Sequence, residues 1–363
     1  MRIAVLYRAL DPRFSKNFPA DTSGREDESY QESIVAALRE KGHDAFAFRV
    51  REDHLQDLAN LDCDLAFNLV EEGLNNDSSL EPHLPAILDV YGLPYTGGDF
   101  LSIATTLDKA RTKEILGYHG VATPAFQIFS GADDPLREGL PFPLIVKPLH
   151  EDASIGVFRD SVVADEAALR RKVRQILRKY RQPAIVEEYV DGRELSVGVI
   201  EQGSRRLVTP VNEVIFNFPP GVPRIFTYVG KWDSDSEEYA GIVPDQCPAL
   251  DLPAAAEEEI RRVGLQVFEL LRLRGYARVD YRLRADGRLF VLEVNANPLI
   301  GEYSVMATMA EKMGWPFPKF IHTIAVEAYR RFQRENRAVT LRRLPPEEND
   351  EGRGAPASAG RRP

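Results

Sequence analysis

The chain has 363 residues, of which 44% are hydrophobic and 28% are charged, a composition that supports buried cores and argues against wholesale disorder. Its length predicts two or three structural units. The net charge of −10 disfavours nucleic acid as a main partner, and two cysteines with six scattered histidines argue against a disulfide framework or a histidine-based zinc site. Because the N-terminus enters a strand-like run at once and no run of about 18 apolar residues occurs, we expect a cytoplasmic protein without a signal peptide or membrane span.

The first hundred residues alternate strand and helix patterns. Strands are predicted at 3–7, 45–50, 64–70 and 93–97, and helices at 30–41 and 80–91. This order of elements is typical of an open α/β sheet. We therefore expect an N-terminal open α/β domain over residues 1–104.

The middle of the chain carries further short strands. Helices are predicted at 105–118 and 165–180, and strands at 122–129, 143–147, 184–190 and 195–200. The dipeptide Asp191-Gly192 between the last two strands predicts a hairpin. Residues 210–245 are rich in proline and aspartate and predict a long loop that is either functional or disordered.

The last third begins with a helix predicted at 253–273. A β-hairpin follows at 276–294, with its turn at Ala285-Asp-Gly287, and two helices are predicted at 304–313 and 318–333. Residues 336–363 lack a periodic apolar pattern, so we expect a disordered tail there.

The predicted hairpin carries the residues with the clearest chemistry. Asp280, Glu293 and Asn295 are oxygen donors on its two strands, and Mg²⁺ prefers oxygen ligands that it shares with nucleotide phosphates. The alternative is an ordinary hairpin with a solvated acidic end. Arg278 lies two positions before Asp280 and therefore on the same strand face, where it could stabilise an oxyanion or simply form a salt bridge with Asp280.

Two lysines stand where a nucleotide site would need them. Lys109 begins a predicted helix and Lys147 closes an apolar strand, so each could contact phosphates, although lysines at element ends also extend to solvent. The small, polar segment 150–157 could close its backbone amides over phosphates. The strand at 187–190 could pair with an adenine edge and Glu194 could bind ribose, with a surface hairpin as the alternative.

The order of these motifs resembles the ATP-grasp superfamily, and within it the D-alanine–D-alanine ligase family. The resemblance covers roughly residues 1–335. The motifs that carry it are Asn68-Leu-Val-Glu-Glu-Gly73, Leu93-Pro-Tyr-Thr-Gly97, Leu107-Asp-Lys109, Ile145-Val-Lys-Pro148, Ala153-Ser-Ile-Gly156, Val186-Glu-Glu-Tyr-Val190, Gly192-Arg-Glu194, Ala277-Arg-Val-Asp280, Leu292-Glu-Val-Asn295 and Asn297-Pro298. It implies an ATP-grasp fold of α/β and α+β class, in which two α+β subdomains, at 105–200 and 201–335, clamp ATP.

The resemblance also implies a reaction and a role for each residue. A carboxylate attacks the γ-phosphate of ATP to give an acylphosphate, and an amine then displaces phosphate to form an amide between two amino acids. Two Mg²⁺ ions, or Mn²⁺ in their place, assist the reaction, and the enzyme is expected to be a homodimer. The implied roles are phosphate contacts for Lys109 and Lys147, adenine for Glu187 and Val190, ribose for Glu194, metal ligands for Asp280, Glu293 and Asn295, a mobile catalytic loop for Ser154, the substrate loop for Lys231 and Trp232, the tetrahedral intermediate for Arg278, and the second substrate's carboxylate for Ser304.

Several positions depart from the family pattern. The phosphate loop reads Asp152-Ala-Ser154 where the family has Gly-Ser-Ser, and Trp232 stands where a tyrosine follows the loop lysine. Asn295-Ala-Asn-Pro-Leu299 ends in leucine where the family has glycine, and Asn68 to Gly73 replaces a His-Gly segment. The N-terminal acidic residue that orients the first substrate in the family has no clean match, and Glu26 and Glu28 are both candidates.

The resemblance implies a D-alanine–D-alanine ligase or a close relative, and the departures leave three alternatives open. The first is a ligase that uses amino acids other than alanine, and the second is a nucleotide-binding protein without ligase activity. The third is an enzyme that only phosphorylates its acceptor.

Overall fold

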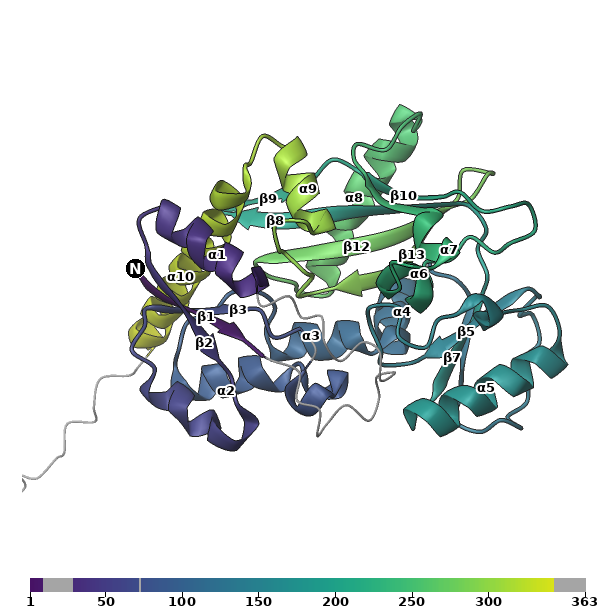
Figure 1. Ribbon diagram of the computed structural model, residues 1–363, viewed down its shortest axis with the longest axis horizontal. Coiled ribbons are helices and arrows are strands. Elements are labelled where there is room, and N and C mark those ends of the chain that lie inside the picture. The colour runs from purple at the N-terminus through teal and green to yellow at the C-terminus, as the bar shows by residue number, and fades with distance from the viewer. Residues whose placement is uncertain (9–28, 72, 343–363) are drawn as a thin grey trace, which may run out of the picture.

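The N-terminal unit is built on a small parallel sheet. The computed structural model describes residues 1–8, 29–71 and 73–342 (Figure 1). The sheet has the order β2-β1-β3 with both pairs parallel, and β1 and β3 are almost entirely buried, as expected for strands covered on both faces. The elements of this unit are β1 (Arg2–Tyr7), α1 (Ser29–Glu40), β2 (Asp44–Arg49), β3 (Leu65–Asn68), α2 (His83–Tyr91) and α3 (Phe100–Leu107).

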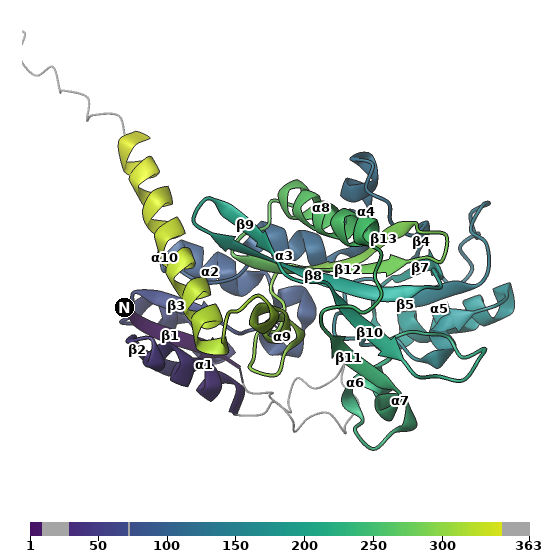
Figure 2. The ribbon, with the colours of Figure 1, turned by 90° about the horizontal axis from the view of Figure 1, so that it is seen from above.

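The last helix of the described chain completes the core of this first unit. Helix α10 (Phe317–Arg342) packs on α1 and β3, and Figures 1 and 2 place it beside the N-terminal sheet. Phe320, Ile321 and Ile324 belong to the same buried cluster as Ile3 and Ile34. The helix extends past residue 336, where the predicted tail was placed; residues 343–363 lie outside the described chain.

A histidine pair joins α1 and β2 to α10. Nε2 of His43 lies 2.9 Å from Nδ1 of His322, so one ring donates and the other accepts. Burial lowers the pKa of both histidines below 6.5, and so do neighbouring positive charges: the N-terminus and His322 around His43, and Lys41 and Arg330 around His322. The folded state therefore favours two neutral rings.

We expect the stability of this contact to fall in mild acid. The unfolded histidines take up protons near pH 6.5 while the folded pair resists protonation, so the stabilisation is full above that pH and is lost as the pH drops below it. As the pH is lowered from 8 to 5, the melting temperature of the wild type should fall more steeply than that of the double variant His43→Gln/His322→Gln. The exposed His119→Gln is the control, and identical pH slopes in all three proteins would contradict the expectation.

The second unit is an antiparallel sheet of the order β4-β7-β5-β6, with α5 packed on it. Its elements are β4 (Phe126–Phe129), β5 (Leu144–Pro148), β6 (Val162–Val163), α5 (Glu166–Tyr180) and β7 (Ala184–Glu188). The predicted hairpin at Asp191-Gly192 is wrong, because β7 stays in this sheet whereas β8 joins the next one. A Cβ on Gly192 would lie 2.2 Å from the carbonyl oxygen of Leu283, so this link requires a glycine.

The third unit is a sheet of the order β11-β10-β8-β12-β13, with β9 paired to β8. Its elements are β8 (Arg193–Gln202), β9 (Arg205–Val208), β10 (Asn212–Phe216), β11 (Ile242–Gln246), α8 (Ala254–Leu270), β12 (Tyr276–Leu283), β13 (Leu289–Asn295) and α9 (Val305–Lys312). The predicted boundary at residue 200 falls inside β8, which belongs wholly to this sheet. The predicted loop at 210–245 is largely ordered, since it contains β10, α6 (Tyr228–Trp232), α7 (Glu237–Ala240) and most of β11.

A short break in the predicted helix at 105–118 positions one of the lysines. The chain forms α3 and α4 (Lys109–Tyr118), with Asp108 between them in an extended conformation. The Asp108 carboxylate accepts hydrogen bonds from the amides of Ala110 and Arg111, so it caps α4 and makes Lys109 its first residue. None of the helices in the described ranges is long and apolar enough to cross a membrane.

Candidate active site

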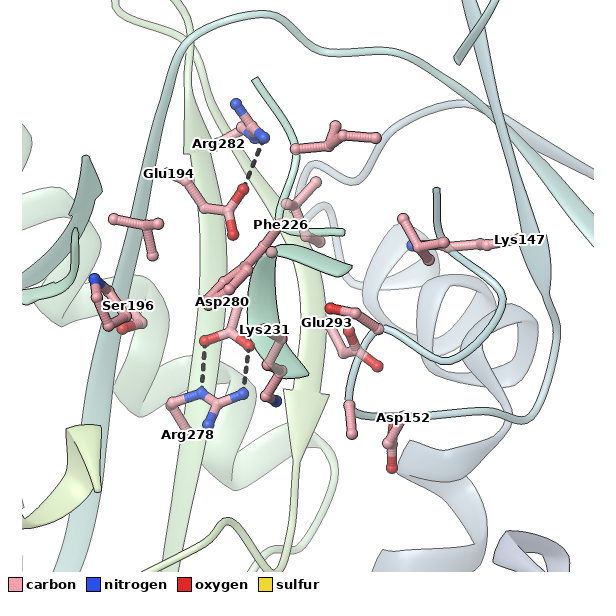
Figure 3. Close-up of a pocket in the computed structure, with 18 of the residues that line it drawn as sticks. Lys147, Asp152, Glu194, Ser196, Phe226, Lys231, Arg278, Asp280, Arg282 and Glu293 are labelled. Carbon is pink, nitrogen blue, oxygen red and sulfur yellow. Dashed lines mark hydrogen bonds and ion pairs between the residues drawn. The ribbon is translucent and has the colours of Figure 1, made fainter. Parts of the chain in front are cut away.

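A cavity of about 450 Å³ lies between the second and third sheets and gathers the predicted residues. β5, β7, β8, β12, β13, α6 and the loop at 151–157 all contribute to its wall (Figure 3). Of the predicted site residues that fall within the described chain, all but Asn295 and Trp232 line it. Those that do are Lys109, Lys147, Ser154, Glu187, Val190, Glu194, Lys231, Arg278, Asp280, Glu293 and Ser304.

The hairpin of β12 and β13 presents its polar side chains on one face. In the antiparallel register Asp280 is opposite Glu293 and Arg278 is opposite Asn295, so alternate residues of both strands point the same way. The guanidinium of Arg278 donates to both oxygens of Asp280, at 2.8 and 2.9 Å. The salt bridge considered as the alternative for Arg278 is therefore present, inside the cavity (Figure 3).

The arginine in this pair stays charged. Burial opposes the positive charge, but the Asp280 carboxylate outweighs burial and raises the pKa of Arg278 above its ordinary value. A permanently cationic group therefore faces the cavity.

Glu293 meets Lys109 and Asp152 at the next position along the cavity. Nζ of Lys109 lies 2.9 Å from Glu293 and 3.4 Å from Asp152. Burial raises the pKa of Asp152. Lys109 acts in the opposite direction, whereas Glu293 raises this pKa further. For Glu293 the attraction of Lys109 and Lys147 outweighs burial, so its pKa is lowered and it is the ionised member of the pair. The side chain of Lys109 is 4% exposed, which excludes the alternative of a solvent-exposed lysine.

The donor set at this position fits a divalent cation. Oε1 of Glu293 is buried and accepts no hydrogen bond with good geometry from the described chain, although Lys109 is near it. Oδ1 of Asn295 accepts the Asn297 amide at 2.9 Å and has a second lone pair. Nowhere in the described residues do three or more histidine, cysteine, aspartate or glutamate side chains gather as a metal site. A cation here would therefore take Asp280, Glu293 and Asn295 together with phosphate oxygens.

Glu187 is held by two lysines, one of which the sequence analysis missed. Its carboxylate lies 3.0 Å from Nζ of Lys147 and 3.2 Å from Nζ of Lys113, and the side chains of Glu187 and Lys113 are each 2% exposed. Burial alone would raise the pKa of Glu187, but the two lysines lower it. Lys113 lies one helical turn after Lys109 on α4, a spacing that could have identified it.

We expect Lys113→Met to destabilise the fold strongly. Removing one partner of a buried ion pair typically costs about 3–5 kcal/mol, because the other charge is left uncompensated. Chemical denaturation should detect a loss of about 3 kcal/mol, at the low end because Lys147 still contacts Glu187. Arg111→Met on the same helix is the control, since its ion pair with Glu114 is exposed. Equal effects of the two substitutions would contradict the prediction.

Arg282 is a second residue that the sequence analysis missed. Its guanidinium donates to Glu194 at 2.6 Å and to the carbonyl oxygen of Gly192 at 2.9 Å (Figure 3). Burial raises the pKa of Glu194, and Arg282 counteracts that increase. The arginine therefore offsets part of the cost of burying this carboxylate in the cavity wall that Val190 also lines.

The loop at 152–156 has an unusual backbone that suits close approach to a ligand. Ala153 and Ser154 have φ angles of 53° and 62°, a region that favours glycine. A Cβ on Gly156 would lie 2.4 Å from Cγ of Pro148, so glycine is required there. Ala153 and Ser154 therefore adopt this backbone at some conformational cost.

Trp232 contacts the same loop without lining the cavity. Its indole N–H donates to the carbonyl oxygen of Ala153 at 3.1 Å, and Nζ of Lys231 lies 5.4 Å from the centre of its ring. The amide of Tyr228 donates to the carbonyl oxygen of Val157. Helix α6 is thus hydrogen-bonded to the segment 151–157 at two points.

The remaining predicted residues are Ser304, which lines the cavity, and the two glutamates Glu26 and Glu28. Ser304 is buried and caps α9 by accepting the amide of Ala307 at 3.1 Å. Glu26 and Glu28 lie outside the described residues.

Comparison with known proteins identifies one family. A family profile described as D-ala D-ala ligase C-terminus matches residues 118–326. An uncharacterised protein, y4sG of Sinorhizobium fredii, is 31% identical over 92% of this chain and 98% of its own length. The D-alanine–D-alanine ligase of Bordetella petrii is 31% identical over 81% of this chain and 85% of its own length.

Solved structures agree on the fold. The crystal structure of D-alanine–D-alanine ligase from Bacillus anthracis complexed with ATP matches 93% of this chain and 99% of its own, with a TM-score of 0.70 at 22% identity. The expected ATP-grasp architecture is therefore confirmed.

Proposed function

This chain belongs to the D-alanine–D-alanine ligase family, and we propose that it is an ATP-dependent ligase that joins the carboxylate of one amino acid to the amine of another. The observation that carries the proposal is the cavity itself. It brings cationic side chains from three elements, Lys109, Lys147 and Arg278, to the same space as the carboxylates Asp280 and Glu293. Such a set suits a polyphosphate and a charged reaction intermediate.

We assign the nucleotide to the part of the cavity between Glu187 and Glu293. Val190 and the strand β7 border the adenine, Glu194 takes the ribose hydroxyls, and Lys109 and Lys147 contact the phosphates. Ser154 and the loop around it lie over the phosphates. Mg²⁺, held by Asp280, Glu293 and Asn295, would neutralise phosphate charge.

The proposed reaction has two steps. An oxygen of the donor carboxylate attacks the γ-phosphorus, the bond to the β-phosphate oxygen breaks, and ADP leaves with the electron pair. The acceptor nitrogen then bonds to the acyl carbon, the carbon–oxygen bond to phosphate breaks, phosphate leaves with the electron pair, and the amine proton passes to water. Arg278 lies where it can stabilise the oxyanion of the second step, and Lys231 borders the same space.

The test is ATP turnover with Mg²⁺ and single or paired D- and L-amino acids, beginning with D-alanine. ADP and phosphate release together with an amide product by mass spectrometry would support the proposal. Hydroxylamine trapping of the acylphosphate reports the first step alone. A stable phosphorylated product would favour a kinase-like enzyme instead, and nucleotide binding without turnover on any carboxylate would favour a binding protein.

A further inference from the structure

The cavity has an apolar rim at the end where the second step takes place. Asn295 is the register partner of Arg278, so the segment that leaves β13 after Asn295 borders the Arg278 end of the cavity. Leu299 and Tyr303 on this segment line the cavity and yet are 45% and 93% exposed. Tyr239 of α7 lines it too and is also exposed; β11 lies in contact with both α7 and α9.

The backbone between Leu299 and Tyr303 determines the exposure of these two side chains. Ile300 is fully buried in the core shared with α1 and α10, and its amide donates to the hydroxyl oxygen of Tyr30 at 3.1 Å. A Cβ on Gly301 would lie 2.2 Å from the ring of Tyr30, so the chain packs directly on that ring. With Ile300 and Gly301 anchored inward, the flanking Leu299 and Tyr303 are held outward.

Single exposed apolar residues are common, but three large ones around the mouth of one cavity mark a surface that contacts a ligand. The ligand that reaches this end of the cavity is the acceptor, because its amine must approach the acyl carbon beside Arg278. The methyl group of alanine is too small to cover this rim. Leu299 also stands where the family resemblance expects glycine.

We propose that the acceptor is an amino acid with a large apolar side chain, branched aliphatic or aromatic, which packs on Leu299, Tyr303 and Tyr239. This inference rests on the proposed ligase function. Leu299 and Tyr303 are then residues that determine specificity, whereas Arg278 acts on the reacting atoms whatever the acceptor.

The experiment compares acceptors at saturating Mg²⁺-ATP, with D- or L-alanine as the donor. Acceptor kcat/KM should be about tenfold or more higher for leucine or phenylalanine than for alanine, in at least one enantiomer. Leu299→Ala and Tyr303→Ala should each remove most of this preference by raising KM for the large acceptor. The kcat/KM for alanine as acceptor should fall much less than that for the large acceptor, and the donor should still form a hydroxamate with hydroxylamine.

Tyr118→Ala is the matched control, because Tyr118 is 87% exposed and does not line the cavity. Hydroxamate formation with no preference for large acceptors, or a preference that survives both rim substitutions, would overturn the inference and leave the ligase function standing. Absence of ADP release with every donor would overturn the function and the inference with it.

Discussion

Glu293→Gln should lower turnover on the order of 10³-fold while leaving the fold intact. Glutamine has nearly the same size and keeps one carbonyl oxygen, but it loses the charge that a cation and Lys109 require. Steady-state ADP release at saturating Mg²⁺ measures the loss. Binding of Mn²⁺ with nucleotide, followed by electron paramagnetic resonance, should weaken in parallel.

Glu311→Gln is the control, because Glu311 is exposed on α9. Unchanged kinetics of Glu293→Gln at saturating Mg²⁺ would remove Glu293 from the metal site. A large fall in melting temperature would instead show that the ion pair with Lys109 mainly supports the fold.

Arg278→Ala should reduce kcat by about 10²-fold or more with little change in KM for ATP. Its guanidinium lines the cavity and donates to both oxygens of Asp280, so it is oriented before the oxyanion forms. The loss should fall on the second step. Rapid-quench kinetics should therefore still detect one equivalent of ADP in the first turnover, followed by slow amide formation.

Two further variants separate catalysis from support of Asp280. Arg278→Lys keeps the positive charge but not the two parallel hydrogen bonds to Asp280. Compared with Arg278→Ala, it should restore the free energy of unfolding more than kcat. Arg278→Ala with Asp280→Asn removes both charges and tests whether an unpaired Asp280 causes the defect. A pure KM effect in Arg278→Ala would contradict the assigned role.

Local patterns predicted the β12–β13 hairpin and the face that its polar side chains share. Alternation along the strands and a turn at Asp286-Gly287 determine which side chains share a face, and Arg278 and Asp280 do lie together. The same kind of signal gave a wrong prediction at Asp191-Gly192, where β7 and β8 belong to different sheets. The pairing of these strands depends on contacts with distant strands and not on the turn between them.

The missed residues depend on contacts between distant segments. Arg282 is 88 positions from Glu194, and no local pattern links them. The sequence around Lys113 does not show that this lysine is buried, and its ion pair with Glu187 is apparent only in the folded chain. The contact between Trp232 and the loop at 152–156 could not be predicted for a similar reason, since the hydrogen-bond acceptor of Trp232 is 79 positions away.

The packing of α10 against the first sheet has a consequence for synthesis of the protein. Phe320, Ile321 and Ile324 complete the core around Ile3 and Ile34, so a nascent chain on the ribosome presents an unfinished apolar surface until these late residues emerge. At roughly 5–20 residues per second, that surface stays open for tens of seconds. The N-terminal unit therefore cannot complete its native packing until helix α10 has been synthesised.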